Sequence, residues 1–198
     1  EELLDMMQLG TPNWMSWYTK RALYSREKLA ADLESIRSFY MNQGYLDFKI
    51  DSVQVSIAPN KSDVYIAINL TEGEKYTLRD SKLTGDLLGL DKELGELLAP
   101  LKSGEIYNAE IVKNVQQSIV DKLSTLGYAF ATANPNPVAD EEHHLVDIVF
   151  TVDPGRRAYV RRVNITGNNR TRDEVIRREV RQYEAAWFDS DKVKLSRD

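Results

Sequence analysis

The sequence predicts an α+β protein built from tandem copies of a strand–helix–helix–strand–strand unit. Three pairs of motifs recur 82 or 83 residues apart: Gly44-Tyr45 with Gly127-Tyr128, "LTEGEKYTL" with "VDPGRRAYV", and "KLTGD" with "NITGN". Between them, stretches with a helical apolar period alternate with stretches in which every second residue is apolar. Spacing this constant across three glycine landmarks indicates an internal repeat, rather than glycines that merely end separate elements.

The second copy, residues 75–153, contains the whole unit. It begins with the strand "EKYTLRDSKLTG", which is followed by helices expected at about 91–100 and 108–126, a strand near 128–138 and the final strand "LVDIVFTVD". The longer helix is predicted from apolar residues at helical spacing, and the final strand from strict alternation. These positions are Val112, Val115, Ile119 and Leu123 in the helix, and Val146, Ile148, Phe150 and Val152 in the strand.

The first and third copies repeat parts of this pattern. In the first copy the helix is marked by Leu29, Leu33, Ile36 and Tyr40, and the final strand by Val64, Ile66, Ile68 and Leu70. Each long helix ends at a Gly-Tyr, where glycine is expected in the left-handed conformation that closes helices. A shorter helix precedes each long one, in "EELLDMM", "DKELGELLAPL" and "RDEVIRREVRQ", with Leu3, Leu94 and Val175 in equivalent positions.

Three domains follow from this register. Residues 1–73 form a unit that lacks its first strand, residues 74–154 form a complete unit, and residues 155–198 form a truncated one. In the complete unit we expect a three-stranded mixed sheet covered on one face by two helices. Such a sheet has two edges, and an exposed edge can pair with a strand from another chain.

The strand after the first Gly-Tyr changes phase along its length. In "LDFKIDSVQVSI" the apolar residues Phe48 and Ile50 are even-numbered, whereas Val53, Val55 and Ile57 are odd-numbered. One extra residue near Asp51–Ser52 produces this change, so we predict a β-bulge there. A strand that ends and restarts would give the same pattern. The functional interpretation is an edge strand bent to accept a partner by strand addition.

Composition excludes several functions. The net charge of −5 argues against nucleic acid as the main partner, and the chain has no cysteine and only two histidines. His143 and His144 are adjacent, so on a strand they would point to opposite faces, and we expect a solvated hairpin turn instead of a metal site. We therefore expect no enzyme, metal site or cofactor. The aromatic residues Trp14, Trp17 and Tyr18 are expected to pack on the helices, or else to form a partner surface.

The motifs resemble POTRA (polypeptide-transport-associated) domains, in particular those of outer-membrane β-barrel assembly factors. Residues 26–78 resemble the third such domain passing into the fourth, and residues 167–193 resemble the start of the fifth, with "RRE-x-RQ-x-E" as the most specific motif. The resemblance implies a soluble periplasmic arm of an outer-membrane protein. This arm would bind accessory lipoproteins and nascent outer-membrane proteins without covalent chemistry. A sibling transporter of the TamA or two-partner secretion type, and a small nucleic-acid-binding module, are the alternatives.

The resemblance also implies two partner sites. The bulged strand corresponds to the segment that docks the propeller-shaped lipoprotein BamB, which suggests contacts from Asp51, Gln54, Val55, Ser56 and Ile57. Val55 and Ile57 could instead face the core. Glu184 corresponds to an acidic residue that meets an arginine of the lipoprotein BamD, with Arg178 and Arg181 beside it. The ordinary alternative is a solvated helix end in which Arg181 pairs with Glu184.

Overall fold

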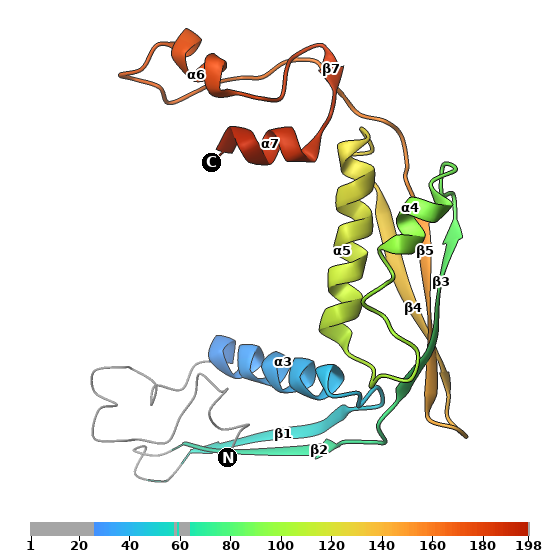
Figure 1. The fold of residues 1–198 in the computed structure, drawn as a ribbon. Helices are drawn as coiled ribbons and strands as arrows, with labels where there is room; N and C mark the ends of the chain where they lie inside the picture. The colour runs from blue at the N-terminus through green and yellow to red at the C-terminus, as the bar shows by residue number, and fades with distance from the viewer. Residues whose placement is uncertain (1–25, 58, 60–63, 198) are drawn as a thin grey trace. The chain divides into compact units, whose positions relative to one another are not determined.

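The computed structural model describes residues 26–57, 59 and 64–197 of the chain (Figure 1). The first predicted short helix, with Leu3, and the aromatic residues Trp14, Trp17 and Tyr18 lie outside the described residues. No helix in the described part of the chain combines the length and apolar character needed to cross a membrane.

The first repeat consists of one helix and one hairpin. Helix α3 (Arg26–Asn42) is followed by the antiparallel strands β1 (Lys49–Ile57) and β2 (Val64–Thr71). Ile36 and Tyr40 of the helix pack on Phe48, and the rings of Tyr40 and Phe48 stack with their centroids 4.3 Å apart. Leu29, Ile36 and Tyr40 are buried as the helical period predicts, while Leu33 is half-buried and the neighbouring Asp32 is fully buried.

The second repeat is the complete unit, as predicted. Its elements are β3 (Thr77–Gly85), α4 (Asp91–Glu96), α5 (Ala109–Thr125), β4 (Thr132–Asp140) and β5 (Leu145–Asp153), and the sheet order is β3-β5-β4. Strand β3 runs parallel to β5, because the amides of Thr77 and Asp86 donate to the carbonyls of His144 and Val152 in the same order. The last strand of the unit therefore lies in the middle, and β4 is an edge.

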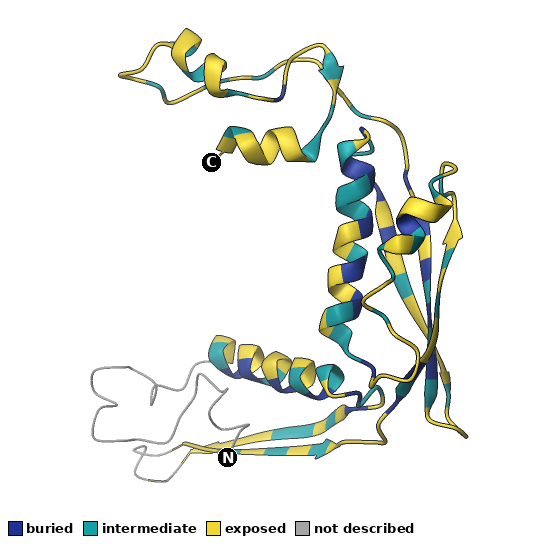
Figure 2. Cartoon of the chain, viewed as in Figure 1, coloured by how far each residue is buried: buried dark blue, intermediate teal, exposed yellow. Residues whose placement is uncertain are grey.

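The core of the second repeat lies between its helices and its sheet. Every apolar position predicted for α5 and β5 is buried, and Leu94 of α4 is fully buried (Figure 2). Strand β2, the counterpart of β5 in the first repeat, shows the same alternation, but Ile66, Ile68 and Leu70 are only half-buried. The difference follows from topology, because β5 has a strand on both sides, whereas β2 is paired only with β1 among the described residues.

The third repeat departs most from expectation. Its leading strand is reduced to β6 (Tyr159–Val160), paired with β7 (Ala186–Trp187), and its helices are α6 (Asp173–Glu179) and α7 (Ser190–Arg197). Val175, the counterpart of the buried Leu94, is 51% exposed. Among residues 155–197 only Gln182 is buried, so the described part of this repeat has no apolar core for Val175 to join.

Two element boundaries in the second repeat also differ from prediction. Helix α4 ends at Glu96, and residues 97–100 form turns that lead to Pro100 instead of continuing the helix. Strand β4 starts at Thr132, not 128, because the residues after Gly127 form a turn closed by the amide of Ala131 on the carbonyl of Tyr128. His143 and His144 lie in the turn between β4 and β5, which confirms the predicted hairpin.

Each Gly-Tyr pair binds the start of the following repeat. The carbonyl of Gly44 accepts a hydrogen bond from the amide of Tyr76 at 2.9 Å, and the ammonium group of Lys75 lies over the ring of Tyr45, 5.1 Å from its centroid. This set of contacts lies within one compact unit of the chain, which joins the first repeat to residues 104–110 and 140–146. Both glycines have the predicted left-handed φ, +96° at Gly44 and +101° at Gly127.

The other compact unit contains the same arrangement after the second Gly-Tyr. The carbonyl of Gly127 accepts from the amide of Ala158 at 2.8 Å, and the guanidinium of Arg157 lies 5.7 Å from the ring centroid of Tyr128. Arg157 also covers the ring of Trp187 at 4.5 Å. The Gly-Tyr motif therefore recurs because it forms the contact between each repeat and the start of the next repeat.

Candidate functional site

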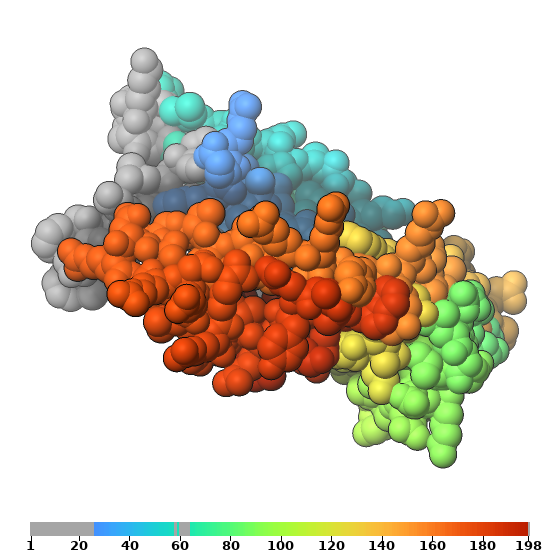
Figure 3. Space-filling model, turned by 90° about the horizontal axis from the view of Figure 1, so that it is seen from above, coloured from blue at the N-terminus to red at the C-terminus, as the bar shows by residue number. Residues whose placement is uncertain are grey.

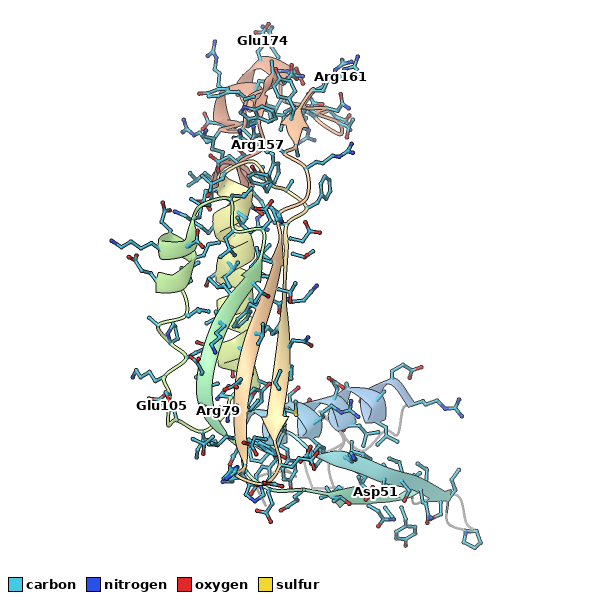
Figure 4. All side chains as sticks on the ribbon, turned by 90° about the vertical axis from the view of Figure 1, so that its right-hand side faces the viewer. Asp51, Arg79, Glu105, Arg157, Arg161 and Glu174 are labelled. Carbon is cyan, nitrogen blue, oxygen red and sulfur yellow. The ribbon has the colours of Figure 1, made fainter. Side chains whose placement is uncertain are left out.

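Strand β1 contains the predicted bulge. Ile50 pairs with Leu70 and Ser52 pairs with Asn69, which leaves Asp51 without a counterpart on β2. Asp51, labelled on β1 in Figure 4, accepts a hydrogen bond from the hydroxyl of Thr71 at 2.7 Å. The side-chain Nδ2 of Asn69 donates to the hydroxyl of Ser52 at 2.8 Å. These two side-chain bonds hold the extra residue in place, so the strand continues through the phase change and does not end there.

The bulge returns the apolar residues of β1 to the face that packs on α3. Ile50, Ile68 and Leu70 pack against the core cluster, and Val53 lies opposite Ile68 in the register. Val55 and Ile57 follow on the same face, but they are 39% and 63% exposed. These two side chains therefore lie on the core-facing side of the sheet, as the alternative held, but they do not fill the core.

All five residues predicted on this strand are exposed. They are Asp51, Gln54, Val55, Ser56 and Ile57, whereas the intervening Ser52 and Val53 are half-buried. By comparison with the sheet order of the second repeat, β1 takes the edge position of β4, and β2 takes the central position of β5. An edge strand presents unpaired N–H and C=O groups that another extended chain can bind. The predicted residues therefore lie on one strand edge that no other described strand covers.

Glu184 lies in the third repeat and has contacts within its own domain. Its Oε1 accepts hydrogen bonds from the amide of Val163 and from Nη1 of Arg177, both at 2.9 Å. The Val163 amide and the Arg177 guanidinium lower the pKa of the Glu184 carboxyl. Oε2 accepts no hydrogen bond from the described residues. Oε1 of this exposed carboxylate is therefore held by hydrogen bonds, and Oε2 is available to accept one.

In the structure Glu184 pairs with Arg177, which is not one of the two arginines named with it from the sequence. Arg177 pairs with both Asp173, at 2.6 Å, and Glu184, and it donates to the carbonyl of Val163 at 3.1 Å. The ordinary alternative, in which Arg181 pairs with Glu184 at a helix end, is wrong, because the chain leaves α6 at Glu179 and no longer has helical spacing at these positions. The side chains of Arg178 and Arg181 are exposed and form no hydrogen bond or ion pair with the described residues.

Gln182 was missed by the sequence analysis, although it belongs to the same motif. Its side chain is buried, donates to the carbonyls of Tyr183 and Trp187, and accepts from the amide of Asp189. It therefore closes the loop that carries Glu184. Val163, Arg177, Val180, Gln182, Tyr183 and Glu184 line a shallow hollow there. This segment, orange to red in Figure 3, lies at the surface. A buried glutamine could have been suspected only from its motif, since polar residues are rarely buried.

No group of three or more histidine, aspartate or glutamate side chains in the described ranges is placed to bind a metal ion. His143 instead contacts Asp140 at 3.1 Å, and the ring of His144 meets the edge of Tyr76. The groups that the two described sites expose are the backbone of β1, and a carboxylate with neighbouring arginines after α6.

The POTRA family model, described as a surface antigen variable number repeat, matches residues 1–73, 76–155 and 158–198. The chain belongs to the POTRA family. A crystal structure of POTRA domains 3–5 of BamA from Haemophilus influenzae matches 98% of this chain and 76% of its own, with a TM-score of 0.86 and 31% identity. The resemblance to consecutive POTRA domains of an assembly factor is thus confirmed, together with the α+β repeat fold.

Curated relatives agree with the structural comparison. The outer membrane protein assembly factor BamA of Neisseria meningitidis serogroup B is 33% identical over 197 residues, which is 100% of this chain. BamA of Buchnera aphidicola is 29% identical over 199 residues. The chain spans 25% and 32% of the length of these two proteins.

Proposed function

We propose that this POTRA array is part of the periplasmic arm of an outer-membrane β-barrel assembly factor, where it acts as a scaffold without catalysis. The observation that carries the proposal is the match over 98% of the chain to POTRA domains 3–5 of a BamA protein. In this role the array binds BamB-like and BamD-like lipoproteins and nascent outer-membrane proteins. The unfolded strands of such clients carry unpaired backbone groups, and an exposed edge can pair them without reading much of their sequence.

The BamB-like contact is assigned to β1. Its five exposed residues lie along one edge, and the bulge at Asp51 bends the strand beside them. A partner on this edge gains backbone hydrogen bonds from the strand and apolar contacts from Val55 and Ile57. These two side chains lie on the face of the sheet that packs on α3, but their exposure leaves them available to a partner.

The test compares Val55→Arg with Val138→Arg. Val138 lies on β4, 83 positions further on, and is likewise exposed, at 53%. We expect Val55→Arg to weaken binding of a purified BamB-like lipoprotein by about tenfold or more, as loss of an interface anchor does, and Val138→Arg to leave it unchanged. Circular dichroism verifies that both variants are folded. An affinity that Val55→Arg does not alter would reject this site.

The BamD-like contact is assigned to Glu184, with Arg178 and Arg181 beside it. The open Oε2 offers a charge-assisted hydrogen bond to an arginine of the partner. Because Oε1 is held by Val163 and Arg177, the carboxylate is already oriented before a partner arrives, which reduces the entropy lost on binding.

Charge reversal with rescue tests this contact. Glu184→Arg should reduce co-purification of a BamD-like lipoprotein, and a partner variant with glutamate in place of its contacting arginine should restore it. The rescue is needed because Glu184→Arg also removes the bond to Arg177. Glu179→Arg, an exposed change of the same charge in α6, is the matched control and should have no effect. Co-purification that is insensitive to Glu184→Arg would remove Glu184 from the interface.

A further inference from the structure

The edge strand of the second repeat contains two prolines. The order β3-β5-β4 leaves one side of β4 unpaired within the part of the chain that the structure describes, and Pro135 and Pro137 lie two residues apart in this strand. Proline has no amide hydrogen, and a paired strand tolerates it where that hydrogen would point away from the neighbouring strand. Both prolines therefore turn their nitrogen atoms to the open side of β4.

The prolines also indicate which residues of the equivalent edge strand, β1, have backbone N–H and C=O groups that point away from the sheet. Residues that share one face of a strand direct their N–H and C=O groups to the same side. Pro135 and Pro137 lie on the same face of β4 as the fully buried Ala133. The residues of β4 whose backbone N–H and C=O groups point away from β5 are therefore those that face the core. Strand β1 occupies the same edge position beside β2. After the bulge its core-facing residues are Val53, Val55 and Ile57.

The two edges thus differ as binding surfaces. On β1, each residue after the bulge whose backbone faces the open side offers both an N–H donor and a C=O acceptor. On β4, two consecutive outward positions have lost the donor, and the proline rings occupy space that the carbonyl groups of a visiting strand would need. Proline on an exposed edge is a recognised means of preventing unwanted strand pairing.

We propose that strand addition to this chain is confined to β1 of the first repeat, and that Pro135 and Pro137 close the matching edge of the second repeat. The occupant of β1 is an extended segment of a partner polypeptide. This inference rests on the proposed function and assigns its strand-binding activity to one of the two edges.

Disulfide trapping tests the proposal, because the chain contains no cysteine of its own. Single cysteines are introduced at Ile57 on β1 and at Ala139 on β4. Both side chains lie on the face of the sheet that carries the core residues, and both are exposed at the end of their strand. The probe is a synthetic peptide that copies residues 64–71, with cysteine as its first residue and two added lysines for solubility. In a glutathione buffer we expect Ile57→Cys to trap this peptide at least about tenfold more than Ala139→Cys, from the loss of two hydrogen bonds.

Removing the prolines should open the second edge. Ala139→Cys combined with Pro135→Val and Pro137→Val is expected to trap the peptide to a similar extent as Ile57→Cys. Trapping by Ala139→Cys with both prolines present, or none after their removal from a folded protein, overturns the inference while strand binding at β1 stands. If Ile57→Cys itself traps nothing, the proposed function at β1 fails.

A reciprocal experiment covers the case in which the proline-free variant does not fold. Val53→Pro with Val55→Pro, in the Ile57→Cys protein, should abolish trapping and leave the circular dichroism spectrum unchanged, because both amides point outward. Gln54→Pro is the matched control. Its amide points toward β2, so this change should disrupt the hairpin itself. Undiminished trapping in the Val53→Pro, Val55→Pro protein overturns the inference.

Discussion

Glu184 is oriented by a residue seven positions before it. The guanidinium of Arg177 joins Asp173, Glu184 and the carbonyl of Val163, and so ties α6 to the loop that follows it. Hydrogen bonds to Asp173 and Glu184 raise the pKa of Arg177, and hydrogen bonds from the Val163 amide and Arg177 lower the pKa of Glu184. Glu184 therefore remains ionised at a lower pH than an ordinary glutamate.

This pairing predicts the titration of Glu184. In the parent protein the carboxyl should titrate below its ordinary range, and Arg177→Met should bring the pKa back toward it. Arg181→Met is the matched control, because the Arg181 side chain has no partner among the described residues. NMR titration gives the pKa of the Glu184 carboxyl in the parent protein and in both variants. A value that Arg181→Met shifts as much as Arg177→Met would mean that general charge, and not this contact, sets the pKa.

The raised pKa values of two tyrosines in the first compact unit predict that the protein loses stability at alkaline pH. A hydrogen bond to Asp47 and burial raise the pKa of Tyr76 to about 12, and burial and a hydrogen bond to Glu72 raise that of Tyr40 to about 12. The folded state holds these protons more tightly than the unfolded state, whose tyrosines titrate near 10. The free energy of unfolding should therefore be unaffected by these groups below about pH 10 and should fall between about pH 10 and 12.

Urea unfolding across this pH range checks the prediction. Tyr76→Phe should lower the free energy of unfolding at neutral pH by about 1 kcal/mol, since one hydrogen bond is lost, and should make its decline above pH 10 shallower. Tyr183→Phe removes an exposed hydroxyl and should leave the slope unchanged. An identical slope in the parent and in Tyr76→Phe would contradict the assignment.

At the scale of elements, the end of β3 depends on a glycine. Gly85 has a φ of +96°, and a Cβ atom there would lie 2.2 Å from the carbonyl oxygen of Val152 on β5. That atom belongs to the backbone and cannot rotate away. The close approach allows Asp86 to donate to the Val152 carbonyl at the end of the parallel ladder.

Gly89 provides a matched comparison. Its φ is +75°, and nothing lies within 4 Å of a Cβ placed there. Gly89→Ala should therefore cost about 1 kcal/mol, from the left-handed backbone alone. Gly85→Ala should cost about 3 kcal/mol, because a steric clash adds to that strain. Thermal or urea unfolding of both variants measures the difference, and equal losses would show that the Gly85 contact relaxes easily.

At the scale of the whole molecule, the Gly-Tyr contacts join consecutive repeats. Arg157 donates through Nε to the carbonyl of Leu126 at 3.1 Å and lies over the rings of Tyr128 and Trp187. Lys194 of α7 adds an ion pair with Asp121 of α5 at 3.0 Å. The second and third repeats are thus connected by side chains as well as by the chain itself.

Loss of Arg157 should loosen this junction. Cation–π contacts contribute about 0.5–2 kcal/mol, so Arg157→Gln should increase proteolytic cleavage around residues 154–158 severalfold and leave the second repeat folded. Arg156→Gln is the control, because the neighbouring Arg156 is exposed and its side chain forms no hydrogen bond, ion pair or cation–π contact with the described residues. Limited proteolysis with mass spectrometry gives the rates. Equal cleavage of both variants would show that Arg157 does not hold the junction.

The repeat, the order of its elements and the bulge could be predicted from the sequence because each is a local periodicity. Alternation locates strands, a 3.6-residue period locates helices, and one extra residue changes the phase. The five positions on β1 came from the family resemblance instead, and their role as a partner site stays a prediction. These features need no knowledge of which segments meet in space.

The tertiary structure decided the contacts between segments distant in sequence. It paired Glu184 with Arg177 and not with Arg181, left Val175 exposed where Leu94 is buried, and placed the final strand of the second repeat between the other two. None of these follows from spacing along the chain, because hydrogen bonds and burial depend on which neighbours a side chain meets after folding. The Gly-Tyr pairs combine both: their recurrence is visible in the sequence, but only the folded chain shows that each one receives the start of the next repeat.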